Sequence, residues 1–307
     1  MTSYEDSTVT TIGQGAFAFC SSLQTLSFPA CTSIGSNAFY NCFSLSTISF
    51  PVCTSIGSSA FYSCYKLTTA SFPSCTSIGN DAFYSCYSLS AASFPACTSI
   101  GENAFAYCRC LETASFPVCT TIRSSAFRYC TSLQTLSFPA CTSIGGYAFS
   151  ACPSLTTISF PVCTSIGSSA FAYCYSLSAA SFPACTSIGE NAFAYCTSLQ
   201  TLSFPACTRI GENALYYCYN LSTASFPACI NISASAFGRC FKLVSLYLLG
   251  SSLVSLANSN VFSSTPIAGY TTSTGGVYGS IYVPSSLLSS YKTATNWTYF
   301  SSRIVGI

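Results

Sequence analysis

Two residue types recur in this sequence at a spacing that could support chemistry, cysteine and tyrosine. The chain has 22 cysteines, and all except Cys110 fall in two columns with a period of 22 residues, Cys20 to Cys240 and Cys31 to Cys229. Cysteines bind metals or form disulfides where they converge, but the chain has no histidine and no Cys-x-x-Cys pair. The pattern favours buried, reduced thiols that pack as small apolar side chains. Disulfides between neighbouring repeats are the alternative, and a metal site is less favoured than either.

The tyrosines follow a related spacing. Because Ala38, Phe39 and Cys42 are expected to share one inward face, the aromatic residues beside them are expected at or near the surface. Tyrosine is enriched in binding surfaces because it contributes a large contact area at a low entropic cost. The candidate ligand-contact residues are therefore Tyr40, Tyr62, Tyr65, Tyr84, Tyr87, Tyr107, Tyr129, Tyr173, Tyr195 and Tyr217. The alternative is that these rings only cover the flank between neighbouring repeats.

Serine and threonine form a third column pattern. Thr25 and Ser27 recur with the same period as Thr47 and Ser49 and in later repeats, which predicts a regular lattice of hydroxyl groups on a strand surface. Such a lattice is typical of ice binding or of contact with a repetitive polymer such as a glycan. The plainer interpretation is that Thr and Ser suit an exposed strand, and we favour it.

Residues for catalysis are scarce. The chain has seven acidic residues and no histidine, so no nucleophile and base pair can be assembled, and no glycine-rich phosphate loop follows a strand. We expect no enzymatic activity and no cofactor.

These columns all arise from one repeat, Leu23 to Ser44 (LQTLSFPACTSIGSNAFYNCFS), which recurs without insertions. A fixed period in the twenties with recurring Leu, Ile and Phe predicts a solenoid, in which each coil buries its apolar face against its neighbours. Within a repeat, residues 23–28 alternate as a half-buried strand that Pro29 ends. Residues 31–34 are expected to form a second short strand, and residues 36–42 a short helix of about two turns after Gly35.

The expected fold class is thus an α/β solenoid of about eleven 22-residue coils, with parallel strands on one side and short helices on another. Three parts are expected: a lead-in over residues 1–11, the solenoid over residues 12–247, and a capping segment over residues 248–307, where the period fails. Residues 1–11 lack the basic and apolar regions of a signal peptide. We expect the chain to belong to something larger.

Composition excludes two classes of partner. Charged residues make up only 5% of the chain and the net charge is +2, which is too little to follow a phosphate backbone, so no nucleic acid is expected. Apolar runs are interrupted every few residues and do not approach the ~18 residues of a membrane span, so no membrane insertion is expected.

The repeated pattern LxxLxFPxCTxIGxxAFxxC, from Ile12 to Cys240, resembles the BspA-type (Treponema pallidum-like) leucine-rich repeat. The segment Ile281 to Ile304 is similar to the terminal segment of bacterial arrays of that family. The resemblance implies a parallel solenoid on bacterial or protist surfaces that serves adhesion and protein interaction, with no catalytic residues to transfer. It therefore implies a cell-surface or secreted location.

From these observations we expect a non-catalytic repeat module that binds a protein or a glycan through a long repetitive face, as a surface adhesin does. Many weak contacts would add up along such a face. The alternative is a structural spacer in a larger surface or phage-tail protein, and an ice-binding Thr/Ser ladder is the less favoured third hypothesis.

Overall fold

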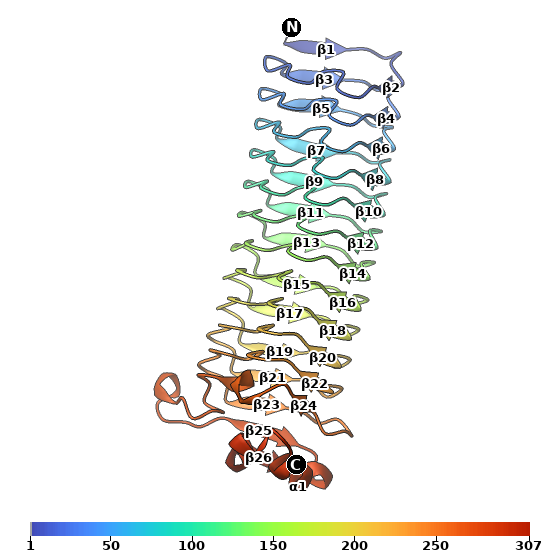
Figure 1. The fold of residues 1–307 in the computed structure, drawn as a ribbon. Helices are drawn as coiled ribbons and strands as arrows, with labels where there is room; N and C mark the ends of the chain where they lie inside the picture. Colours follow the sequence, from blue (N-terminus) through green and yellow to red (C-terminus); the bar gives the residue numbers. More distant parts are fainter. Residues whose placement is uncertain (1) are drawn as a thin grey trace. The chain divides into compact units, whose positions relative to one another are not determined.

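The computed structural model describes residues 2–307. The chain divides into two compact units, with boundaries Met1–Leu155 and Thr156–Ile307. In each unit the chain winds into coils, and the short strands of successive coils stack in parallel (Figure 1). Partners in neighbouring strands lie 22 residues apart, as in the pairing of Thr25 with Thr47. Like residues therefore lie above like residues, which places each column of the sequence on one line of the structure.

The first unit contains two sets of strands. One set comprises β1 (Ser3–Glu5), β3 (Thr25–Ser27), β5 (Thr47–Ser49), β7 (Thr69–Ser71), β9 (Ala91–Ser93), β11 (Thr113–Ser115) and β13 (Thr135–Ser137). The other comprises β2 (Thr11–Ile12), β4 (Ser33–Ile34), β6 (Ser55–Ile56), β8 (Ser77–Ile78), β10 (Ser99–Ile100), β12 (Thr121–Ile122) and β14 (Ser143–Ile144).

The second unit repeats this arrangement. Its first set comprises β15 (Thr157–Ser159), β17 (Ala179–Ser181), β19 (Thr201–Ser203), β21 (Thr223–Ser225), β23 (Ser245–Tyr247), β25 (Ser280–Val283) and β26 (Ile304–Gly306). Its second set comprises β16 (Ser165–Ile166), β18 (Ser187–Ile188), β20 (Arg209–Ile210), β22 (Asn231–Ile232) and β24 (Ser255–Leu256). Helical turns follow near the C-terminus: η1 (Ser259–Phe262), η2 (Thr272–Thr274), η3 (Ser285–Leu287), α1 (Leu288–Thr293) and η4 (Thr298–Arg303).

The predicted parallel solenoid is confirmed, with about 14 turns instead of about eleven. The additional turns lie outside the regular repeats. β1 pairs with β3, while β25 pairs with β23 and β26 pairs with β25. Strand pairing thus extends beyond the regular repeats at both their N-terminal and C-terminal ends.

The segment after each glycine is not the expected short helix but a run of turns. Asn37 and Asn41 have φ angles of 57° and 60°, which an α-helix does not contain. The N–H of Phe39 donates to the carbonyl of Ala60 in the next coil at 2.7 Å, whereas the N–H of Tyr40 donates back to Asn37 at 3.1 Å. Alternate amides therefore bind the neighbouring coil, and this cross-coil bonding replaces the helical ladder.

Two columns of phenylalanine fill the core. Within a column the rings stack, with centroids 5.1 Å apart for Phe39 and Phe61 and 5.9 Å apart for Phe50 and Phe72. Between columns they meet at an angle, as do Phe50 and Phe61 at 65°. Offset stacks and edge-to-face pairs are the favoured aromatic geometries, so each coil contributes the same stabilising contacts to the next.

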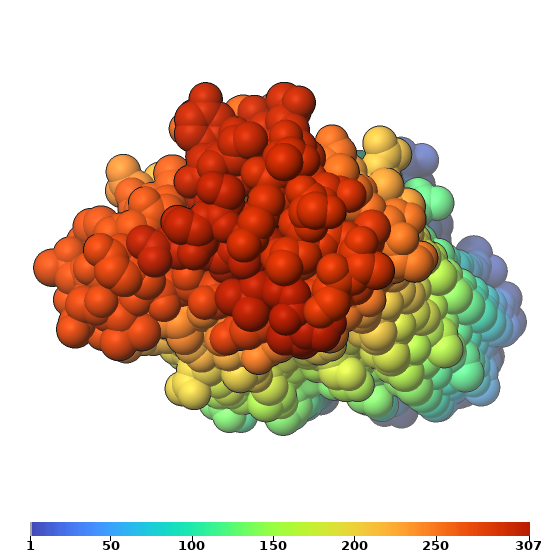
Figure 2. All heavy atoms as spheres, turned by 90° about the horizontal axis from the view of Figure 1, so that it is seen from below, coloured from blue at the N-terminus to red at the C-terminus, as the bar shows by residue number. Residues whose placement is uncertain are grey.

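The end of the second unit is closed by residues from its C-terminal segment. Viewed from that end, the red and orange spheres lie over the yellow coils (Figure 2). Trp297 is buried and its indole N–H donates to the carbonyl of Val254 at 2.7 Å, while the buried Tyr291 hydroxyl accepts from the N–H of Val254 at 3.2 Å. The ring of Tyr291 also packs against Trp297 with centroids 4.9 Å apart. The last coil is covered by aromatic side chains whose polar atoms are satisfied.

Candidate functional site

The cysteine columns prove to be part of the core. Cys31 donates from its thiol to the carbonyl of Ser33 at 3.2 Å, and Cys42 donates to the carbonyl of Phe17 in the preceding coil at 3.0 Å. Burial raises the pKa of the Cys53 thiol to about 12. Since only the thiolate is a good nucleophile or metal ligand, these columns are suited to packing and not to chemistry.

Two cysteines differ from the rest. Cys20 and Cys110 are exposed. In residues 2–307 there is no group of three or more His, Cys, Asp or Glu side chains that could hold a metal ion.

The candidate tyrosines lie together on the turn side of the coils. We call the outward aromatic side chains that follow the Ala-Phe pairs the tyrosine strip. In the first unit, Tyr40, Tyr62 and Tyr84 form one stacked column with centroids 4.9 and 4.8 Å apart. Tyr65 and Tyr87 form a second column, 4.9 Å apart.

A third column of the first unit joins Tyr107 to Tyr129, with centroids 4.7 Å apart. In the second unit Tyr173, Tyr195 and Tyr217 stack at 4.8 and 5.2 Å. All ten candidates therefore stand in stacked columns. Tyr87 and Tyr173 are exposed and the other eight are half-buried, so each ring is partly covered by its neighbours and partly open to solvent.

An aromatic ring stays on the strip even where its position in the coil shifts. Tyr84 follows the Ala-Phe pair directly and Tyr107 comes one residue later in the next coil, yet their rings lie 5.3 Å apart. Tyr107 has a φ angle of 62°, a conformation that costs residues other than glycine about 1–2 kcal/mol and that asparagine tolerates better. Asn41 occupies the equivalent position at a φ of 60°. Tyrosine at this position is therefore not explained by backbone preference.

Partial burial also affects the hydroxyl groups of the strip. Burial raises the pKa of Tyr62, and the neighbouring Tyr40 adds to the rise. Burial raises the pKa of Tyr195 as well, with a further contribution from Tyr173. These phenols therefore remain protonated at neutral pH and can donate hydrogen bonds.

Sequence reasoning missed the basic residues on this side of the coils. Arg109 lies over the ring of Tyr87 at 5.3 Å, Arg128 lies over Tyr129 at 5.0 Å, and Lys242 lies over Tyr219 at 5.5 Å. The signal was present in the sequence for two of them, because Arg109 shares the column of Tyr65 and Tyr87, and Arg128 shares that of Tyr62 and Tyr84. A search by residue type separated charges from rings that the fold brings together.

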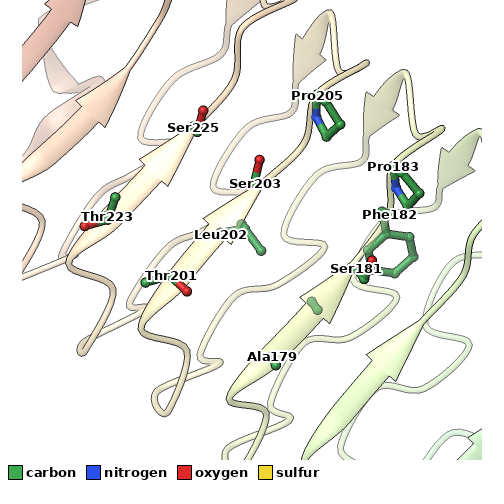
Figure 3. Close-up of a pocket in the computed structure, with 11 residues that line it drawn as sticks. Ala179, Ser181, Phe182, Pro183, Thr201, Leu202, Ser203, Pro205, Thr223 and Ser225 are labelled. Atoms are coloured by element: carbon green, nitrogen blue, oxygen red, sulfur yellow. The ribbon is translucent and has the colours of Figure 1, made fainter.

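The Thr/Ser strand surface is the second candidate. In the second unit it contains a shallow groove of about 490 Å³ over β17, β19 and β21. The side chains of Thr201, Ser203, Thr223 and Ser225 line it, and Ala179 stands where neighbouring strands have threonine (Figure 3). The lining residues carry no charge, so the groove suits a neutral ligand that bonds to hydroxyl groups.

None of the helices in the described part of the chain is long and apolar enough to cross a membrane.

Comparison with known proteins identifies the repeats. The family model described as a BspA type leucine rich repeat region matches residues 3–112, 98–206 and 164–275. No curated protein matches. Similar solved structures include a leucine rich cell surface protein from Faecalibacterium prausnitzii, with 25% identity over 80% of this chain and 84% of that one and a TM-score of 0.39. Others are a leucine-rich repeat protein from Eubacterium ventriosum (18% identity, 86% and 83% coverage, TM-score 0.49) and one from T. pallidum (23%, 62% and 82%, 0.43).

Proposed function

The chain belongs to the BspA-type leucine-rich repeat family, and we propose on that premise that it is a non-catalytic binding module that attaches to a protein or glycan through the tyrosine strip. Its role is that of a surface adhesin, located at the cell surface or secreted. One solved relative is described as a leucine rich cell surface protein, which supports this location.

The observation that supports the strip as the binding face is the change of column between Tyr84 and Tyr107. The ring is kept on the strip although the later position has a positive φ angle that disfavours tyrosine. Packing alone needs no hydroxyl group there, whereas a contact surface gains from a large ring with a polar end. Repetition along the coils then adds weak contacts into useful avidity.

The strand groove is a second possible contact face because it offers several hydroxyl groups in one depression. The depression in the strand surface also argues against the ice-binding hypothesis, because ice binding needs a flat and regular lattice of hydroxyl groups. The threonine column is interrupted at Ala91 and at Ala179.

The experiment is a binding screen of the purified chain against mucins, matrix proteins and a glycan panel. A variant with Tyr62, Tyr65, Tyr84 and Tyr87 changed to Ser removes two neighbouring stacks of the strip. The matched control changes Thr201, Ser203, Thr223 and Ser225 to Ala, which alters the same number of side chains on the strand groove. Circular dichroism checks that each variant remains folded.

We expect the parent to bind and the folded tyrosine variant to lose most of that binding, while the control retains it. Loss only in the control would move the site to the strand groove. Absence of binding by all three proteins would contradict the adhesin proposal for this panel and favour the spacer hypothesis.

A further inference from the structure

Arg128 has an unusual position on the tyrosine strip. Its guanidinium lies between two rings, 5.0 Å from the centroid of Tyr129 and 5.3 Å from that of Tyr147. Its Nε atom is buried and has no hydrogen-bond partner. Within residues 2–307, no carboxylate forms an ion pair with Arg128. The guanidinium is thus a planar cation in contact with two rings and without an anion among the described residues of the protein. It is available to bind an anionic ligand.

Basic residues occur preferentially in the segment of the repeat to which Arg128 belongs. Five of the nine Lys and Arg residues fall in the short segment between each Ala-Phe pair and the next leucine: Lys66, Arg109, Arg128, Arg239 and Lys242. None of the seven acidic residues lies in this segment. Asp81 comes close to it, since its carboxylate adds to the rise in the pKa of Tyr84 that burial and neighbouring tyrosines cause. That contact lies two coils before Arg128.

The stacked rings themselves favour an anion. Inside a column both faces of a tyrosine are covered by its neighbours, as for Tyr62 between Tyr40 and Tyr84. The rings therefore present their edges and hydroxyl groups to a ligand. Ring edges carry the positive part of the aromatic quadrupole, and a protonated phenol donates a hydrogen bond. Edges, O–H donors and guanidinium groups all attract negative charge.

The repeat distance favours a polysaccharide over a peptide. Successive rings on the strip lie 4.7 to 5.3 Å apart in the first unit. An extended peptide places side chains on one face every ~6.6 Å, so it falls out of register after a few coils. Each residue of a polysaccharide is one sugar ring, and the length of one sugar ring is comparable to the separation of successive coils.

We propose that Arg128, held between Tyr129 and Tyr147, is an anion-binding centre of the tyrosine strip, and that its ligand is an acidic polysaccharide with carboxylate or sulfate groups. The terminal nitrogens of Arg128 bind one acidic group of the ligand. Arg109 in the preceding coil contributes positive charge for the next acidic group. The inference rests on the proposed function, because it names the class of ligand that the same strip binds.

The test measures affinity for four probes: polygalacturonate, heparin, neutral dextran and polyglutamate. The parent is compared with Arg128→Gln, which removes the charge, and with Arg128→Lys, which keeps the charge but loses the planar group. The matched control is Arg123→Gln, because Arg123 is an exposed residue of the same coil and its loss changes the net charge equally. Thermal unfolding checks that each variant is folded.

We expect the parent to bind polygalacturonate or heparin but not dextran, and to bind polyglutamate more weakly. Arg128→Gln should lose about tenfold in affinity, the value of one charge-assisted hydrogen bond. Arg123→Gln should stay within about twofold, because the charge of the exposed Arg123 is screened by solvent and salt. Arg128→Lys should recover only part of the loss, because lysine binds as a point charge. Polygalacturonate carries carboxylates only and heparin carries both carboxylates and sulfates, so tighter binding of heparin would indicate that sulfate contributes, and equal or tighter binding of polygalacturonate would indicate that carboxylate is sufficient.

Several outcomes would overturn this inference. Equal affinity of the parent and Arg128→Gln would remove Arg128 from the site, and tighter binding of polyglutamate would replace the polysaccharide with an acidic peptide. Binding of mucin or matrix proteins without binding of any acidic probe would refute the inference and leave the proposed function standing. No binding of any probe or panel member would refute both.

Discussion

The thiol of Cys64 donates a hydrogen bond to the carbonyl oxygen of Phe39, 3.3 Å away in the preceding coil. Cys86 makes the same bond to Phe61 at 3.2 Å. The column thus links each coil to the one before it through an S–H group, which adds a second hydrogen bond to a carbonyl that already accepts from its own turn segment, as Phe39 does from the N–H of Cys42 at 3.2 Å. This arrangement requires the thiol to be protonated, which makes stability depend on pH.

Stability should fall on the alkaline side. Burial raises the pKa of Cys53, Cys97 and Cys218 from 9.0 to about 12. A group whose pKa is raised on folding contributes full stability below its unfolded value and loses it as the pH rises from about 9 towards the folded value. Each such thiol lowers the free energy of unfolding by about 1.4 kcal/mol per pH unit in that window. Denaturation midpoints measured at rising pH should therefore drop steeply above about pH 9.

Thiolate absorbance, followed separately from that of tyrosinate, should appear together with unfolding. A midpoint that stays constant through the alkaline range would contradict the assignment.

Thiol labelling should divide the cysteines into two classes. Cys20 and Cys110 are exposed, whereas the column thiols from Cys31 onward are buried. In native protein an alkylating reagent should modify two residues quickly, because reaction requires an accessible thiolate. The buried thiols should react only after unfolding, as counted by mass spectrometry. Cys110→Ser should reduce the fast class to one residue, and fast reaction of a third thiol would show that a coil is open.

The glycine before each turn segment should resist substitution. A β-carbon on Gly57 would lie 2.5 Å from the amide nitrogen of Ser36, so Gly57→Ala should destabilise the fold by about 1–3 kcal/mol, as overpacking does. Gly13 precedes the first turn segment and has nothing within 4 Å, so Gly13→Ala is the control and should change stability by less than about 0.5 kcal/mol. Equal denaturation midpoints for the two variants would contradict this prediction, because they would show that the neighbouring coil accommodates the added β-carbon without a loss of stability.

Arg123 shows how a side chain is accommodated at this position. Its N–H to Ile100 carbonyl distance is 3.4 Å, compared with 2.8 Å for the N–H of Gly57 to Ile34. The bond to the neighbouring coil is lengthened at Arg123, whereas the smaller Ser233 at the equivalent position keeps a bond of 2.9 Å to the carbonyl of Ile210.

Removing the closing tryptophan should destabilise the second unit. Trp297→Ala deletes a buried ring and the hydrogen bond to Val254, and should cost about 3–5 kcal/mol. Trp297→Phe keeps most of the apolar volume but leaves the carbonyl of Val254 without this donor, and should lower the free energy of unfolding by about 1–3 kcal/mol. Tyr299→Ala is the control because Tyr299 is 71% exposed. Chemical denaturation followed by circular dichroism measures all three, and a Trp297→Ala midpoint equal to that of the control would refute the capping role.

The period of the sequence was sufficient to predict the solenoid, because a constant spacing allows only stacked coils that bury like residues on like. It was not sufficient to predict the turn segment. Ala38, Phe39 and Cys42 fit a helical face, but alternate amides bind across coils, and this interaction is not visible within one repeat. The residues at position 37 and its equivalents, mostly Asn, Asp or Ser, were the available signal, since Asn37 tolerates a positive φ.

The candidate site was predicted in part. The spacing of Tyr40, Tyr62 and Tyr84 was enough to place them on one line of the structure. The contact between Tyr84 and Tyr107, and the position of Arg128 between Tyr129 and Tyr147, depend on side-chain directions that a positive φ angle sets. Column membership alone therefore located the strip but not the ring contacts of its basic residues.

The cross-coil bonds of the turn segments also determine how either unit responds to mechanical force. Bonds such as that from Phe39 to Ala60 run from one coil to the next, so tension that separates neighbouring coils loads them in line and breaks a few at a time. Strand partners lie 22 residues apart, as for Thr25 and Thr47, and each released coil therefore adds about 70–80 Å of extended chain. A molecule anchored at one end and attached to a ligand at the other would lengthen stepwise under load and let the attachment survive a sudden pull.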